Sequence, residues 1–89
     1  MRAAWYSEYG SASDVFKFDD IPDPIAGDGE VVVKVYSSGL NPTDWISRMG
    51  SRGPFMYDLI VPHHDGSGVI IEVGPGVERS RIGERVWLY

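Results

Sequence analysis

The chain contains no cysteine among its 89 residues, so neither disulfide bonds nor thiolate metal ligands can contribute to its structure. Basic residues are also scarce: 8 Lys and Arg stand against 13 Asp and Glu, which gives a formal net charge of −5. Arg79, Arg81 and Arg85 are interleaved with Glu78 and Glu84 and form no basic run. The sequence therefore offers no electrostatic footprint for a nucleic-acid backbone or an anionic membrane surface.

Long apolar runs are absent as well. The longest apolar stretch covers only a few residues, far below the length that spans a bilayer. Residues 1–6 lack the extended apolar core of a signal peptide. With 43% hydrophobic and 24% charged residues, the composition is that of an ordinary globular protein. We therefore expect one soluble, cytoplasmic domain over residues 1–89.

What the sequence does contain is a series of short strand patterns separated by turn signals. Strands are expected at residues 3–6, 15–18, 30–36, 68–74 and 85–89. In the strongest of them, residues 30–36, the valines recur with period two, and we expect this strand to be covered on much of both faces. This spacing of strands and turns indicates an all-β barrel or sandwich, and the pattern does not choose between them.

One short helix is predicted between the strands. Asn41 suits the N-cap, Pro42 suits the first helical position, and Asp44 places a negative charge in the first turn. Trp45 and Met49 lie four residues apart and would form the apolar stripe of the helix, with Ile46 as a further candidate. We expect a helix inserted between strands, without a helical layer around it.

Two turn-rich polar segments stand out, at residues 38–44 and 62–66, and each adjoins an apolar strand pattern. The chain between them is long enough to fold one segment beside the other. Binding and catalytic residues commonly lie on such loops, positioned by rigid strands. Taken alone, this pattern supports only a pocket hypothesis.

The order of these motifs resembles the N-terminal, GroES-like portion of the medium-chain dehydrogenase/reductase superfamily, on its quinone oxidoreductase (zeta-crystallin-like) branch. The matching motifs are residues 1–4, 30–35, 39–44, 62–68, 69–77 and 83–87. The resemblance covers essentially the whole chain. It implies a mainly β fold: a GroES-like, partly open β-barrel with one short helix, truncated before the Rossmann domain.

In the superfamily, a Rossmann domain follows, and its glycine-rich turn binds the pyrophosphate of the cofactor. No strand–GxGxxG–helix segment occurs in this chain, and residues 74–76 are interpreted as a tight turn. The resemblance therefore implies a catalytic portion without the nucleotide-binding domain. We expect this portion alone to be inactive and not to bind NADPH.

In the zinc-dependent alcohol dehydrogenases of this superfamily, a zinc-ligating Cys occupies the position of Asn41. By the same resemblance, Thr43 takes the position of a proton-relaying Thr or Ser, and Asp44 that of an Asp behind the zinc site. A Gly, a zinc-ligating His and a Glu normally occupy the positions of His63, His64 and Asp65.

Asn41 is the departure that favours the quinone oxidoreductase branch. A neutral amide is a poor zinc ligand compared with Cys, His or a carboxylate, and the zinc-free quinone oxidoreductases carry Asn here. The resemblance implies no zinc and hydride transfer from NADPH to a quinone or an activated alkene. Its catalytic candidates are Asn41, Thr43 and His64, its cofactor-binding candidates are Asn41 and Asp44, and its substrate-pocket candidates are Trp45, Tyr57 and Asp65.

These residues also have structural interpretations that the sequence leaves open. Asn41 and Asp44 can serve as an N-cap and a first-turn acid only. His63 is expected to make loop hydrogen bonds, and His64 with Asp65 can be either an orienting pair in a pocket or a structural contact. Aromatic residues outside the region 45–57 are expected mainly in the core: Trp5, Tyr6 and Trp87.

Two other functions stay open at this point. One is a stand-alone GroES-like β-barrel module, similar to a co-chaperonin, and the other is a zinc alcohol dehydrogenase with a degenerate site. For the preferred function, the expected partners are a small-molecule quinone or enone and, in the full-length form, further copies of the same protein. Neither nucleic acid nor membrane is expected as a partner.

Overall fold

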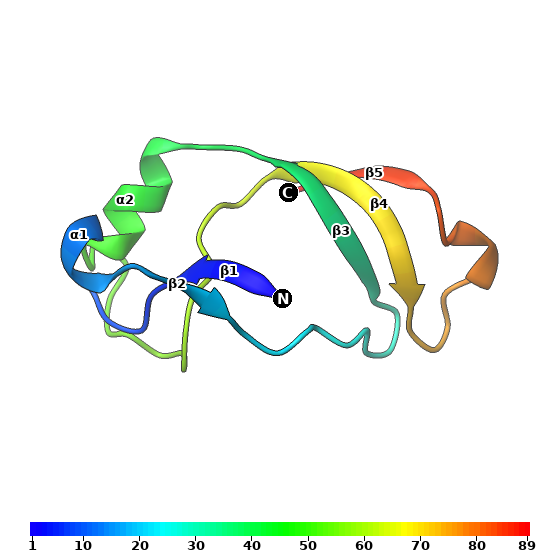
Figure 1. Ribbon diagram of the computed structural model, residues 1–89, viewed down its shortest axis with the longest axis horizontal. Helices are drawn as coiled ribbons and strands as arrows, with labels where there is room; N and C mark the ends of the chain where they lie inside the picture. The colour runs from blue at the N-terminus through cyan, green and yellow to red at the C-terminus, as the bar shows by residue number, and fades with distance from the viewer. The chain divides into compact units, whose positions relative to one another are not determined.

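The computed structural model describes residues 1–89 and is mainly β, as predicted. The chain divides into two compact units, residues 1–22 with 40–63 and residues 23–39 with 64–89. The elements in chain order are β1 (Arg2–Trp5), α1 (Ala12–Val15), β2 (Lys17–Asp20), β3 (Val31–Ser38), α2 (Pro42–Arg48), β4 (Gly66–Val73), the 3-10 helix η1 (Arg79–Arg81) and β5 (Arg85–Leu88) (Figure 1). None of the helices has the length and apolar character needed to traverse a lipid bilayer.

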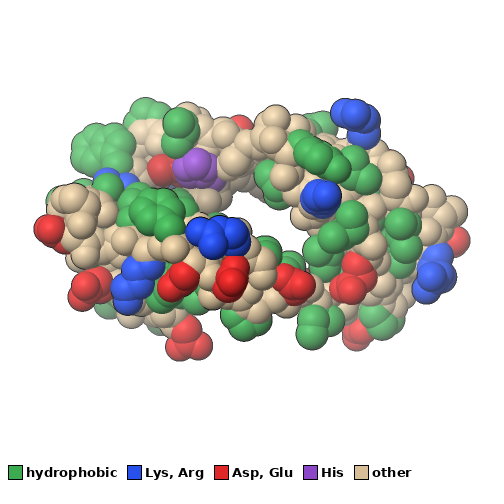
Figure 2. Space-filling model, viewed as in Figure 1, with side chains coloured by type: hydrophobic (Ala, Val, Ile, Leu, Met, Phe, Trp, Pro, Cys, Tyr) green, Lys and Arg blue, Asp and Glu red, His purple; other side chains and the backbone are tan.

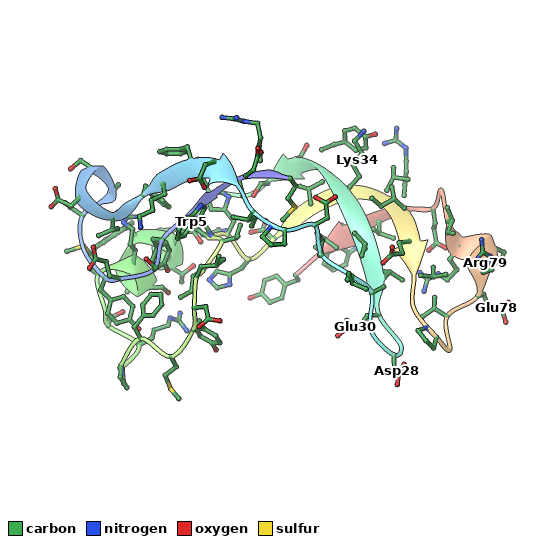
Figure 3. All side chains as sticks on the ribbon, turned by 60° about the horizontal axis from the view of Figure 1, so that its bottom comes forward. Trp5, Asp28, Glu30, Lys34, Glu78 and Arg79 are labelled. Carbon is green, nitrogen blue, oxygen red and sulfur yellow. The ribbon has the colours of Figure 1, made fainter.

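The first unit contains an antiparallel ribbon of β1 and β2, in which Trp5 lies opposite Lys17. Trp5, labelled in Figure 3, donates a hydrogen bond from Nε1 to Asp19 Oδ1 at 2.7 Å. Lys17 Nζ lies 4.9 Å from the centre of the Trp5 ring. Such cross-strand contacts stabilise a two-stranded ribbon that is marginal by itself.

The core of the first unit is built around Tyr6, which is 2% exposed. Phe16 and Phe55 meet its ring edge-on, with centroids 5.9 and 6.0 Å away. Burial raises the pKa of the Tyr6 hydroxyl above its ordinary value, because desolvation disfavours the charged phenolate. Tyr6 is therefore a core residue, as predicted.

The prediction of a strand over residues 15–18 is wrong at its start. The chain forms the helical turn α1 up to Val15, and β2 begins only at Lys17. Ser11 precedes this turn and donates a hydrogen bond from Oγ to Asp14 Oδ2 at 2.8 Å. A Ser followed three residues later by an acid is an N-terminal helix signal, and the buried Val15 anchors the turn.

The second unit contains a three-stranded antiparallel sheet in the order β3-β4-β5 (Figure 1). In its register, Val33 lies opposite Ile70 and Val35 lies opposite Gly68. Ile70 is fully buried and forms the centre of this unit's core. A Cβ at Gly68 would overlap the backbone carbonyl of Lys34, so glycine permits this close approach of β3 and β4.

The prediction that the strand at residues 30–36 is covered on both faces is wrong. Val35 is exposed and Tyr36 is 66% exposed, and apolar side chains reach the surface over this sheet (Figure 2). The second unit contains no α-helix to pack on the sheet, and the ladder register shifts between Val35 and Ser37. Trp87, expected in the core, is likewise exposed.

Candidate functional site

The first turn of α2 carries three of the predicted site residues. Asn41 is the N-cap, with extended backbone angles (φ −133°, ψ 152°), and Pro42 follows at the start of the helix. Asn41 and Asp44 form a capping box, in which the Asn41 N–H donates to Asp44 Oδ2 at 2.8 Å. The predicted N-cap and first-turn acid are thus confirmed, and they fix the backbone of Asn41.

His63 belongs to this cluster as well, although only loop hydrogen bonds were predicted for it. Its Nε2 lies 3.9 Å from Asp44 Oδ2, within ion-pair range but longer than a direct hydrogen bond. His63 has a φ of 85° and is the only residue other than glycine with a positive φ. This backbone conformation costs roughly 1–3 kcal/mol in a non-glycine residue. The signal in the sequence was a His at the position where, by the resemblance, the zinc-dependent alcohol dehydrogenases normally have Gly.

The exposed side of α2 differs from the prediction. Trp45 is 56% exposed and Met49 is also exposed, so they do not form a buried stripe. Ile46 is half-buried, and the polar Arg48 shares the covered side. Arg48 donates from Nε to the Gly10 carbonyl at 3.3 Å, and its guanidinium lies 5.1 Å from the centre of the Phe16 ring. Arg48 therefore contacts two segments of the same unit, at Gly10 and at Phe16.

Two other predicted residues of the first unit lie at different depths. Thr43 is half-buried in the first turn of α2. Tyr57 is exposed in the loop that follows the helix. Trp45 and Tyr57 therefore have the accessibility that the predicted substrate-pocket role requires, and that role stays a prediction.

Asp65 belongs to the second unit, where its carboxylate packs against Gly39. The Gly39 N–H donates to the Asp65 carbonyl at 2.8 Å, and a Cβ at Gly39 would overlap both carboxylate oxygens of Asp65. Asp65 contributes to a groove of about 400 Å³. The other residues that line this groove are Ser37, Ser38, Gly39, Gly66, Ser67, Trp87, Leu88 and Tyr89.

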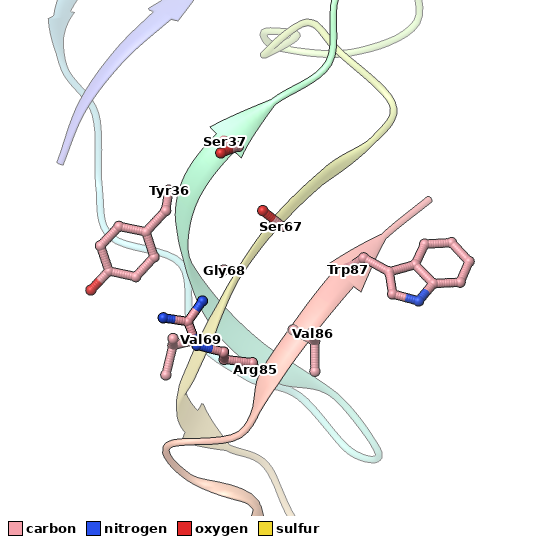
Figure 4. A pocket seen from close by; sticks show the side chains of 8 residues that line it. All are labelled: Tyr36, Ser37, Ser67, Gly68, Val69, Arg85, Val86 and Trp87. Atoms are coloured by element: carbon pink, nitrogen blue, oxygen red, sulfur yellow. The ribbon is translucent and has the colours of Figure 1, made fainter.

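A second groove of about 530 Å³ continues along the same sheet and shares Ser37, Ser67 and Trp87 with the first (Figure 4). Figure 4 shows the Arg85 side chain extending from β5 across β4, whereas Trp87 points away from the sheet. These lining residues were not predicted from the sequence, because strand register brings them together and no local motif marks them.

The structure gathers Asn41, Asp44 and His63 into one cluster, whereas His64 and Asp65 belong to the other unit. A single pocket formed by His64 with Asn41 and Thr43 therefore stays a prediction. Nowhere do three or more His, Asp or Glu side chains gather closely enough to hold a metal ion. With an amide at position 41 and no Cys, the donor set does not fit a zinc centre.

Residues 27–89 match the family described as the alcohol dehydrogenase GroES-like domain. The chain is 32% identical over 88 residues to a chloroplast envelope quinone oxidoreductase homolog of Arabidopsis thaliana, with 97% of this chain and 27% of the relative covered. It is 38% identical over 92 residues to an alcohol dehydrogenase of Moraxella sp. (strain TAE123), with 100% of this chain and 26% of the relative covered.

The solved structure of a mycobacterial protein complexed with NADPH is similar to this chain with a TM-score of 0.84 at 28% identity. That similarity covers 98% of this chain and 27% of the mycobacterial one. The chain thus spans about a quarter of the length of these proteins. These findings confirm the GroES-like fold and the resemblance inferred from the motifs. The chain belongs to the alcohol dehydrogenase GroES-like domain family, within the medium-chain dehydrogenase/reductase superfamily.

Proposed function

We propose that this chain is the N-terminal catalytic-domain portion of a zinc-independent oxidoreductase that reduces a quinone or an activated alkene with NADPH. The observation that carries the proposal is Asn41 at the N-cap of α2, an amide where the zinc enzymes place a thiolate. The relative described as a quinone oxidoreductase homolog supports the substrate class. The NADPH complex of the mycobacterial protein supports the cofactor.

In this reaction NADPH supplies the hydride, and the protein positions the acceptor and excludes water. The Asn41 amide can donate or accept a hydrogen bond at the nicotinamide–substrate face, and the capping box with Asp44 holds its backbone in place. Thr43 and His64 are the candidates for polarising the acceptor carbonyl or delivering a proton to it. Trp45, Tyr57 and Asp65 would line the substrate pocket.

The same family suggests where this protein acts, on what kind of molecule, and in which oligomeric state. We propose a cytoplasmic protein that acts on a small molecule and assembles as a homo-oligomer in its whole form. The net charge of −5 and the interleaved basic residues give no reason to expect nucleic acid as a partner.

The second candidate function is that of a zinc alcohol dehydrogenase with a degenerate site. The 38% identity to the Moraxella alcohol dehydrogenase favours it. The donor chemistry argues against it, because His64 alone at a ligand position, beside an amide at 41, is too weak a set for zinc. We therefore prefer the quinone reductase.

Two substitutions of Asn41, made in the whole protein, test the proposal. If Asn41 only caps α2, Asn41→Ser should be nearly silent, because Ser caps about as well, and Asn41→Ala should cost about 1 kcal/mol of stability. If Asn41 faces the nicotinamide and the acceptor, both variants should lose on the order of tenfold or more in kcat/KM. We expect the Ser variant to keep its thermal stability and to lose kcat/KM.

The Ser variant is the sharper of the two, because it separates capping from catalysis. Steady-state kinetics with NADPH and a quinone, paired with thermal unfolding of each variant, give both readouts. Unchanged kinetics in both variants would leave Asn41 as a helix cap and would contradict its proposed role.

A further inference from the structure

We propose that His63 is a positioning residue, which acts through Asp44 to hold the backbone of Asn41 in place. What Asn41 then does in catalysis rests on the proposed function. How His63 holds Asn41 rests only on the geometry of the cluster.

The cluster is centred on one carboxylate oxygen. Asp44 Oδ2 accepts the Asn41 N–H at 2.8 Å and lies 3.9 Å from His63 Nε2. The Asp44 side chain is 10% exposed and that of His63 is 27% exposed, so solvent screens the attraction of the carboxylate for a protonated imidazole less than it would in a surface pair. A contact from His63 therefore restrains the same oxygen that holds the Asn41 backbone.

The backbone of His63 points to the same role. Its φ of 85° lies in the left-handed region, which glycine adopts without strain and other residues adopt at a cost. Any side chain larger than that of glycine, including the His63 imidazole, therefore strains the backbone at this position. The contact with Asp44 supplies a reason for the residue, since glycine would leave Asp44 without it.

The two possible roles of His63 make opposite predictions for His63→Gly. If His63 serves only to stabilise the fold, the His63→Gly protein should lose stability and activity together. A positioning residue in a strained conformation would leave the protein as stable or more stable, because glycine relieves the strain, while the restraint on Asn41 weakens.

The first experiment needs no activity and uses the 89-residue chain. Amide hydrogen exchange at Asn41 is measured by NMR in wild type, His63→Gly, His63→Asn and His63→Gln. Gln extends an amide N–H to about the reach of the imidazole, whereas Asn tolerates the left-handed backbone but is too short. We expect exchange at Asn41 to rise at least about two- to fivefold in the Gly and Asn variants, since a surface ion pair is typically worth that range and this pair is less exposed, and to stay slow with Gln.

The Asn variant separates the lost contact from the added flexibility of glycine. Faster exchange in the Gly variant alone would be a flexibility effect and would overturn the proposal. Equal exchange in all four proteins would overturn it as well.

The second experiment uses the whole protein and measures kcat/KM with NADPH and a quinone, together with thermal stability. We expect His63→Gly to lose kcat/KM several-fold without a loss of stability, and His63→Gln to restore most of the rate. Absence of quinone reduction in the wild type would contradict the proposed function and not the restraint measured by exchange. An active wild type with an equally active His63→Gly variant would overturn the role of His63.

Discussion

At the scale of single residues, Gly39 makes a close contact with the carboxylate of Asp65 near the candidate site. A methyl group on Gly39 would overlap both carboxylate oxygens of Asp65. Gly39 has no positive φ, so its backbone conformation does not itself demand glycine. The carboxylate of Asp65 must move to make room, so we predict that Gly39→Ala destabilises the chain by about 1 kcal/mol, the low end for overpacking, measured by urea unfolding.

The matched control is the double variant Gly39→Ala/Asp65→Ala, compared with Asp65→Ala alone. Removing the carboxylate opens the space that the new methyl group needs, so the added effect of Gly39→Ala should shrink to a few tenths of a kcal/mol. An equal loss in both backgrounds would show that the contact with Asp65 does not determine the residue at position 39.

Sequence reasoning succeeded at this scale where the signal is local. Asn41, Pro42 and Asp44 predicted a helix start within four consecutive positions, and the capping box confirms it. The sequence did not predict that His63 lies beside Asp44, because the two residues are far apart in the chain and no local motif links them. Contacts between distant residues depend on how the loops close.

At the scale of elements, the predicted strands correspond to β1 to β5, with boundaries shifted by a few residues. Alternating apolar residues and the Gly- and Pro-rich turns between them were sufficient to locate these five strands. The helix was located correctly, but its covered side was not, because Arg48 packs inward on Phe16 and leaves Trp45 exposed. Long cationic side chains can cover apolar surface, which a simple hydrophobic pattern does not express.

This corrected orientation of α2 makes a prediction about Trp45. Because its side chain is 56% exposed, Trp45→Ala should change the free energy of unfolding by no more than about 0.5 kcal/mol. Tyr6→Ala, which empties the core of the same unit, should cost about 3–5 kcal/mol. Urea unfolding of both variants provides the comparison, and a loss for Trp45→Ala as large as that for Tyr6→Ala would show that the predicted stripe is buried after all.

At the scale of the whole molecule, the motif order predicted the family, and the match over residues 27–89 confirms it. The grooves of about 400 and 530 Å³ on the second unit were not predictable, because the pairing of β3, β4 and β5 creates them. The chain spans about a quarter of the length of its relatives. The proposed activity should therefore be measured in the whole protein.

The measurement that tests the central claim most directly is quinone reduction by NADPH in the whole protein, before and after treatment with a zinc chelator, alongside elemental analysis for zinc. The protein should be produced without a His-tag. We expect far less than one zinc per chain and an unchanged rate after chelation, because the residue at the ligand position is Asn41. Stoichiometric zinc, together with activity that chelation abolishes and zinc restores, would contradict it and favour the alcohol dehydrogenase.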